Sequence, residues 1–189
     1  AMHGHEHERY FDTLRAQGYE IDGFLRRFRR FGRVLDRLPA SLRIAVTAGA
    51  EHYTATFGHF AFEDPLLEEA HPTMRRLILW HATEEIEHKA VAFDVMKAAG
   101  VSYPVRILGF LIATFALFGW TFVGARMLLR QDGLSRRAVG ALQREIDARG
   151  DHTIRRRVRR HVLAYFRRDF HPNDVDDLAV AHDRLRAIG

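Results

Sequence analysis

Residues 72–99 read PTMRRLILWHATEEIEHKAVAFDVMKAA and carry apolar residues at intervals of three and four. A helix turns by about 100° per residue, which places one set of side chains on a single side. That side consists of Met74, Leu77, Ile78, His81, Glu85, His88, Ala92 and Val95. Proline suits the first position of a helix and glycine suits its C-terminal end, so we expect a helix that opens at Pro72 and closes at Gly100.

The same helical spacing recurs along almost the whole chain, and the period-two alternation typical of strands is hard to find. The sequence therefore predicts an all-α fold. Further helices are expected from the start to about Gln17 with Gly18 as a cap, from Asp22 to Pro39, from Ser41 to Asp64, over 135–149, over 152–168 and after Asp176.

The chain has no cysteine, which excludes disulfides, zinc–thiolate sites, iron–sulfur clusters and cysteine nucleophiles. Any metal must therefore sit on nitrogen and oxygen ligands. The net charge of +5 is unevenly spread, because residues 126–189 hold 15 arginines against nine acidic residues. Such asymmetry indicates either an anionic partner surface, such as lipid headgroups or nucleic acid, or a solvated helix face.

Glu85 and His88 interrupt an otherwise apolar helix side. Burying an unpaired carboxylate is unfavourable, so a buried glutamate needs a partner charge or a metal. The i, i+3 spacing of these two residues is the Glu-x-x-His arrangement with which helix bundles hold paired metals. His81 lies one turn earlier on the same side, Glu84 lies at its edge, and Glu87 should point to solvent. A purely structural hydrogen-bonded pair of Glu85 with a histidine or an arginine is the alternative.

A second acidic residue stands in a matching setting on another predicted helix. Glu51 lies on a stripe that also contains Ile44, Ala48, Ala55 and Phe62. The small residues among them leave room beside the carboxylate, as a metal ligand requires. His52 lies off this stripe, where we expect it to contact a ligand from outside or to lie at the surface.

The first predicted helix supplies a third contribution. His3 and His7 share one side with Tyr10 and Leu14, and Glu6 lies at the edge of that side. We interpret the histidines as ligands or as groups close to ligands, the alternative being a tag remnant or a solvated turn.

A bundle-borne dimetal site takes one Glu from each of two helices and a Glu-x-x-His pair from each of two others. The chain offers Glu51, then Glu85 with His88, then His3. The glutamate that would pair with His3 falls one position before Ala1, and the remaining glutamate would need an earlier helix. The template therefore predicts that the natural chain extends upstream or that the site is incomplete.

Residues 79–95, LWHATEEIEHKAVAFDV, resemble the signature of the bacterial "predicted metal-dependent hydrolase" family. Further similarity lies in residues 1–9, in AEHYTA at 50–55 and in FHP at 170–172. The resemblance implies a ferritin-like helical core. It also implies a set of metal ligands, His3, Glu51, Glu85 and His88, with further polar contacts from His7 and His81.

Residues 107–125 form an uncharged run of nineteen, long enough to cross a membrane. A helix that is apolar all round also describes the centre of a soluble bundle, and both readings stay open. The flanks carry arginine on both sides, whereas a single crossing normally has its positive excess on one side. If residues 105–130 dock on a membrane, the basic C-terminal region would meet anionic headgroups.

One domain spanning 1–189 is expected. Its parts are metal-site helices at about 1–100, an additional long apolar helix at about 105–129 and basic helices at about 134–189. The arginine cluster at 155–160 lacks an aromatic stacking platform, so nucleic acid is not an expected partner.

Three functions follow from these residues. In the first, a divalent metal activates water for hydrolysis, with Glu84 or Glu85 as the proton carrier. In the second, two irons activate oxygen and oxidise a hydrophobic substrate. In the third, the protein binds metal without catalysis, or its polar groups pair as structure.

We expect two ions, iron first with zinc or manganese as alternatives, and a small, lipid-like substrate. A cytoplasmic location, association with the inner membrane and a homo-oligomer are compatible with the sequence.

Overall fold

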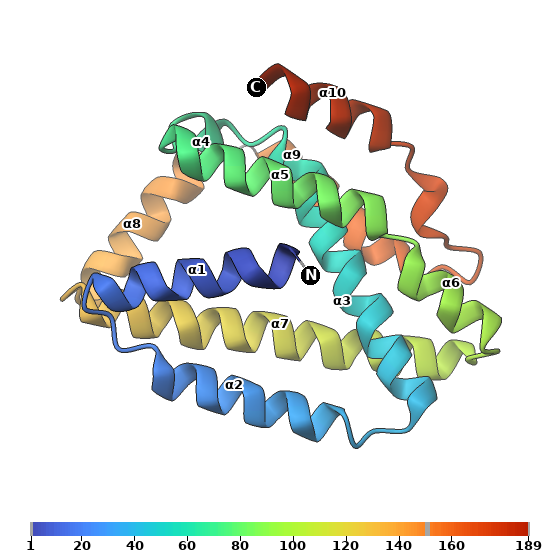
Figure 1. The fold of residues 1–189 in the computed structure, drawn as a ribbon. Helices are drawn as coiled ribbons and strands as arrows, with labels where there is room; N and C mark the ends of the chain where they lie inside the picture. The colour runs from blue at the N-terminus through green and yellow to red at the C-terminus, as the bar shows by residue number, and fades with distance from the viewer. Residues whose placement is uncertain (1, 150–151, 189) are drawn as a thin grey trace. The chain divides into compact units, whose positions relative to one another are not determined.

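A computed structural model describes residues 2–149 and 152–188 (Figure 1). The side chains of residues 2–6, 65–66, 149, 152–153, 184–185 and 187–188 lie outside this description. The helices are α1 (Met2–Ala16), α2 (Asp22–Leu35), α3 (Ala40–Ala61), α4 (Pro65–Glu68), α5 (Pro72–His88), α6 (Val91–Ala98), α7 (Tyr103–Gln131), α8 (Arg136–Arg149), α9 (His152–Ala164) and α10 (Leu178–Ile188), with a short 3₁₀ helix at Pro172–Asp174. No strand occurs in the described ranges, so the all-α fold is confirmed. The ferritin-like arrangement stays a prediction.

Local signals set most helix ends. Gly18 has a φ of +91°, the left-handed conformation that terminates α1 as expected. Pro72 opens α5, and the His71 side chain caps it by accepting the backbone N–H of Thr73 at 3.3 Å. The predicted helices 22–39 and 152–168 end earlier, at Leu35 and Ala164.

The structure has two helices where the sequence predicts one. The expected helix from Pro72 to Gly100 is interrupted after His88, and α6 starts again at Val91. The Lys89 ammonium at the break donates to the carbonyl oxygen of Val175 at 2.5 Å and to the carboxylate of Asp177. Because these partners come from far along the chain, the apolar periodicity of residues 72–99 could not have indicated the break.

The chain divides into two compact units. Unit 1 comprises residues 1–38 and 116–146, and unit 2 comprises residues 39–115 and 147–189. The single domain expected from the sequence is not tested by this division and stays a prediction.

Unit 2 is built around α3, which packs against α5, α6 and α9, while α10 packs against α5 (Figure 1). Small residues permit the close approaches. A Cβ atom on Gly109 would lie 2.5 Å from the carbonyl carbon of Ala45, and one on Gly49 would lie 2.8 Å from the Cα of Phe110. The start of α7 therefore crosses α3 with the two backbones almost in contact.

Arg106 anchors the start of α7 in unit 2. The side chain is buried, and its guanidinium donates to the backbone oxygens of Tyr165 and Arg167 at 3.0 and 2.5 Å. It also lies over the ring of Tyr103, 4.8 Å from the centroid. The arginine that precedes the apolar run is therefore an internal anchor, and the positive charge beside the run lies at its C-terminal end.

Unit 1 gathers aromatic side chains around Trp120 of α7. The rings of Phe24, Phe28 and Phe31 from α2 lie 5.6, 5.4 and 5.6 Å from the Trp120 ring. The Phe24 and Phe28 rings meet Trp120 edge to face and the Phe31 ring is tilted, and aromatic contacts at these distances add to the burial of apolar area. This cluster holds α2 along the C-terminal half of α7.

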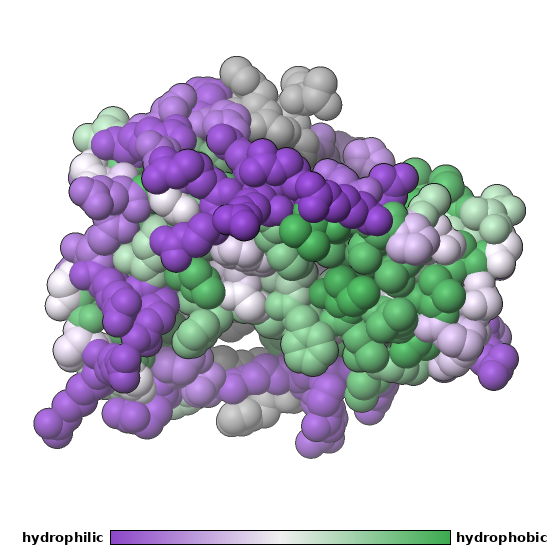
Figure 2. All heavy atoms as spheres, turned by 90° about the horizontal axis from the view of Figure 1, so that it is seen from below, coloured by the Kyte–Doolittle hydropathy of each residue, from purple (hydrophilic) through white to green (hydrophobic). Residues whose placement is uncertain are grey.

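The apolar helix α7 spans Tyr103–Gln131 and is long and apolar enough to cross a membrane by length and composition. Only 17% of the residues in its most apolar window are buried. Phe115 and Phe122 are 78% and 67% exposed, and Leu108, Leu111 and Phe118 are exposed as well. Figure 2 shows hydrophobic residues gathered over a continuous area of one face. The part of the chain that is described therefore does not enclose α7 as a core helix.

Candidate metal centre

Glu51 and Glu85 come from two helices that pack together, α3 and α5. Oε2 of Glu51 is buried and has no hydrogen-bond partner in the described chain. Burial raises the pKa of Glu51 above its usual value, and the negative charge of Glu85 raises it further. A buried carboxylate oxygen without a partner is costly, so this atom is the strongest indication that Glu51 is a cation ligand.

The first turn of α6 faces the same carboxylate. The backbone N–H of Ala92 lowers the pKa of Glu51, as does the positive charge that His88 can carry. The first N–H groups of a helix have no partner within it and favour an anion. The break between α5 and α6 therefore places the N-terminus of α6 beside Glu51, where it stabilises the carboxylate.

Glu85 is half-buried, and its Oε1 lies 3.5 Å from Nε2 of His81, one turn earlier on α5. His88 is exposed at the end of α5, although the helical periodicity predicts an inward side chain. Glu84 is half-buried. Glu87 is exposed, as expected, and accepts a hydrogen bond from Nε2 of His182 at 2.6 Å.

The remaining predicted residues belong to α1 in unit 1. The side chains of His3 and Glu6 lie outside the described residues, and His7 is exposed. No group of three or more His, Asp and Glu side chains placed to hold a metal occurs among the side chains that the structure describes.

The donor chemistry of the described residues fits a divalent cation. Glu51 and Glu85 supply carboxylate oxygens, and His88 supplies an imidazole nitrogen, the ligands that iron, manganese and zinc share. The unpartnered Glu51 oxygen is free to coordinate such an ion. Glu51 and Glu85 would form part of a ligand set, whereas the exposed His88 is not grouped with them among the described side chains.

Sequence reasoning placed His52 at the surface or beside a ligand, and the surface alternative is wrong. His52 is 3% exposed, and its Nε2–H donates to the carbonyl oxygen of His161 at 3.2 Å. Burial and the neighbouring His161 lower the pKa of His52 to about 4, so the imidazole is neutral at pH 7. The residues of the Glu51 stripe lie on one side of α3. His52 lies on another side, which packs against α9 and is therefore buried as well.

The sequence did not predict a second polar cluster, which consists of His59, Lys89 and Asp177. Nδ1–H of His59 donates to Oδ2 of Asp177 at 2.9 Å, and the Lys89 ammonium donates to Oδ1. Asp177 is buried, and the Lys89 side chain is only 10% exposed. His59 follows Glu51 by eight residues on α3, which was a possible signal, but nothing local indicates Asp177, more than a hundred residues away.

Replacing Asp177 with asparagine is expected to destabilise the protein by about 3–5 kcal/mol, because the Lys89 charge would stay buried without its counter-ion. Burial raises the pKa of Asp177, but the hydrogen bonds from His59 and Lys89 outweigh it and hold this pKa below its usual value. A depressed carboxyl pKa contributes stability above the unfolded-state pKa, which is lost as the pH falls through the folded-state pKa.

Urea denaturation of the wild type and of Asp177→Asn from pH 7 to pH 3 measures both effects. The difference between the two proteins should be largest near neutral pH and should shrink below about pH 4. Asp183→Asn on α10, an exposed position, is the control. Equal stabilities of the wild type and Asp177→Asn at pH 7 would contradict the assigned ion pair.

The fold and the site define an all-α protein with a half-buried glutamate, one of whose oxygens is enclosed between packed helices, beside a Glu-x-x-His pair. A family model described as "Predicted metal-dependent hydrolase" matches residues 1–176, and the chain belongs to that family. The resemblance seen in the sequence is thereby confirmed. No curated protein and no solved structure matches the chain.

Proposed function

We propose that the protein hydrolyses an ester-like or amide-like bond at a divalent metal held by Glu51 and Glu85, with His88 joining them from the end of α5 when the ion binds. The observation that carries this proposal is the buried, unpartnered oxygen of Glu51 beside a second carboxylate. Membership of a family predicted to be metal-dependent hydrolases supports the same class of reaction. We expect two ions as the full complement.

A bound divalent cation lowers the pKa of water and polarises a carbonyl or phosphoryl oxygen. Side chains of the protein supply proton transfer and orientation of the ligands. Glu84, half-buried next to Glu85, takes the proton from the attacking water and returns it to the leaving group. His81, beside the Glu85 carboxylate, orients that carboxylate.

Elemental analysis of full-length protein together with turnover of a chromogenic ester tests this function. Zinc or manganese in the protein with metal-dependent turnover would support hydrolysis. Two irons with a visible absorption band and no ester turnover would support oxygen chemistry at the same ligands, the second function compatible with a carboxylate–histidine set. Protein without bound metal, whose melting temperature is unchanged by metal or chelator, would refute both.

We also propose that α7 docks the protein on a membrane, which agrees with a lipid-like substrate. The exposed phenylalanines of α7 are the contact, since burying one such side chain contributes about 1.5–3 kcal/mol. Arg126, Arg130 and Arg136 follow at the C-terminal end, where they would meet anionic headgroups. Residues 105–130 would thus hold the protein at the cytoplasmic face of the inner membrane.

Replacing Phe115, Phe118 and Phe122 with serine is expected to weaken binding to anionic vesicles by more than tenfold, because three apolar contacts are lost. Co-sedimentation measures the effect. The matched control replaces three exposed apolar residues elsewhere, Leu142, Ile146 and Val180, with serine. If the wild type stays in the supernatant without detergent, or if both triple variants bind equally, membrane docking through α7 is refuted.

A further inference from the structure

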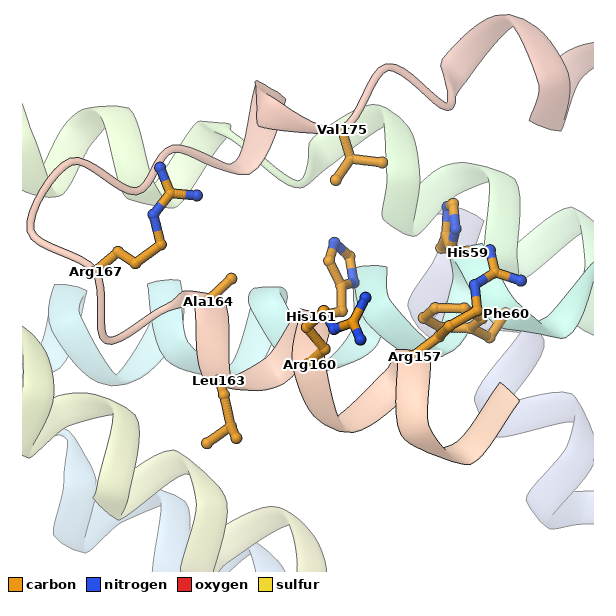
Figure 3. A pocket seen from close by; sticks show the side chains of 9 residues that line it. All are labelled: His59, Phe60, Arg157, Arg160, His161, Leu163, Ala164, Arg167 and Val175. Carbon is orange, nitrogen blue, oxygen red and sulfur yellow. The ribbon is translucent and has the colours of Figure 1, made fainter. Parts of the chain in front are cut away.

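Unit 2 contains a pocket of about 540 Å³ that the proposed hydrolysis does not use. Its described lining comes from the end of α3, from α9 and from the segment that follows α9 (Figure 3). Three arginines and two histidines contribute to it: Arg157, Arg160, Arg167, His59 and His161. None of the nine described lining residues is acidic. The pocket therefore favours an anion.

Two of the arginines are held in place by partners outside the lining. The guanidinium of Arg157 donates to both carboxylate oxygens of Glu63, at 2.5 and 3.1 Å, and lies 5.1 Å from the centroid of the Phe60 ring. Arg167 donates to both oxygens of Asp169, at 3.1 and 2.8 Å. Each guanidinium has five N–H donors, so these pairs leave donors for a ligand while restricting the side chain.

Arg160 is different. It is exposed and forms no ion pair within the described ranges. The charges of Arg157 and Arg167 are compensated by neighbouring carboxylates, so Arg160 carries the uncompensated charge of the pocket. A ligand anion would be its counter-ion.

His161 supplies a buried polar atom that lacks a partner. Nδ1 of His161 has no hydrogen-bond partner among the described atoms, and Figure 3 shows the imidazole projecting from α9 between Arg160 and Val175. An unsatisfied buried polar atom is unfavourable, and this nitrogen lies below the surface of a pocket that the rest of the His161 side chain lines. The backbone oxygen of His161 is already used, since it accepts from His52.

The lining also has an apolar part, formed by Phe60, Leu163, Ala164 and Val175. A volume of about 540 Å³ exceeds what a bare inorganic anion fills and is of the size of small-molecule sites. The planar arginine fork matches the oxygens of phosphate, and several donors around one point suit a dianion better than a monoanion. The ligand should therefore combine a phosphate group with an apolar body.

We propose that this pocket binds a small organic phosphate, with the phosphate group between Arg157, Arg160 and His161 and the organic part against Phe60 and Ala164. The site is separate from the candidate metal centre, because His59 and Glu51 are eight residues apart on α3, or about 12 Å along the helix. The proposal does not depend on the proposed hydrolysis.

Titration calorimetry of the full chain with phenyl phosphate tests the proposal, with inorganic phosphate and benzoate as comparison ligands. Phenyl phosphate should bind more tightly than either. Arg160→Gln should weaken its binding about tenfold or more, because one charge-assisted interaction is lost. Arg159→Gln, an exposed neighbour on α9 outside the lining, should bind phenyl phosphate as the wild type does.

Glu51→Gln separates this site from the metal centre and should leave phenyl phosphate binding unchanged. Three results would overturn the proposal. The first is equal binding by the wild type and Arg160→Gln, the second is tighter binding of benzoate than of phenyl phosphate, and the third is loss of binding in Glu51→Gln but not in Arg160→Gln. Circular dichroism spectra of the variants verify that each one is folded.

Discussion

Glu51→Gln is expected to lose the bound metal and, without metal, to melt at a higher temperature than the wild type. Glu51 combines burial with an oxygen that has no partner in the described chain, so its charge destabilises the metal-free protein. An ion at one hundred times its Kd adds about 2.7 kcal/mol to the wild type. For a protein of this size that gain corresponds to a rise in Tm of about 5–10 °C, which the variant should not have.

Melting curves with and without added metal measure the higher Tm of the metal-free variant and the missing rise in Tm on adding metal. Elemental analysis measures the loss of bound metal. Glu85→Gln should also lose metal, with a smaller change in the metal-free Tm because Glu85 lies beside His81. Glu87→Gln on the same helix is the control, since the Glu87 carboxylate is exposed and bonds to His182. Unchanged metal content in Glu51→Gln would show that the assigned ligand set is wrong.

Gly109→Ala is expected to destabilise unit 2 by about 3 kcal/mol, a large effect for one methyl group. The new Cβ would lie 2.5 Å from both the carbonyl carbon and the Cβ of Ala45, and 2.8 Å from its carbonyl oxygen. Two of these three atoms belong to the backbone, so no side-chain rotation relieves the overlap, and α3 and α7 must move apart.

Gly119→Ala on the same helix is the matched control, because a Cβ at Gly119 would meet nothing within 4 Å. The control should gain about 0.5–1 kcal/mol from the better helix propensity of alanine. Urea denaturation followed by circular dichroism gives both values. If Gly109→Ala and Gly119→Ala change the midpoint in the same direction, the close crossing of α3 and α7 is refuted.

Several elements could be predicted because their signals are local. Proline at the start of α5, a glycine of positive φ after α1 and the apolar periodicity of the helices all act within a few residues. The same local reasoning singled out Glu51, since a carboxylate among small apolar residues on one helix stripe is visible without a partner. The structure buries its oxygen accordingly.

Other features depend on partners that are remote in the chain. The break after His88 coincides with contacts of Lys89 to Val175 and Asp177, so periodicity alone predicted one continuous helix where there are two. His52 is buried although it lies off the predicted stripe, because α3 is covered on more than one side. His88 is exposed although the helical pattern placed it inward, since it is the last residue of α5.

The helical fold, the absence of thiol chemistry and the burial of a Glu51 oxygen were readable in the amino-acid sequence, because helix formation and the burial of one helix side follow from side chains a few positions apart. The tertiary structure alone decided which polar groups meet, as in the Asp177 ion pair and the arginine pocket. Such groups come together only when segments about a hundred residues apart pack, and helical periodicity carries no information about which segments those are.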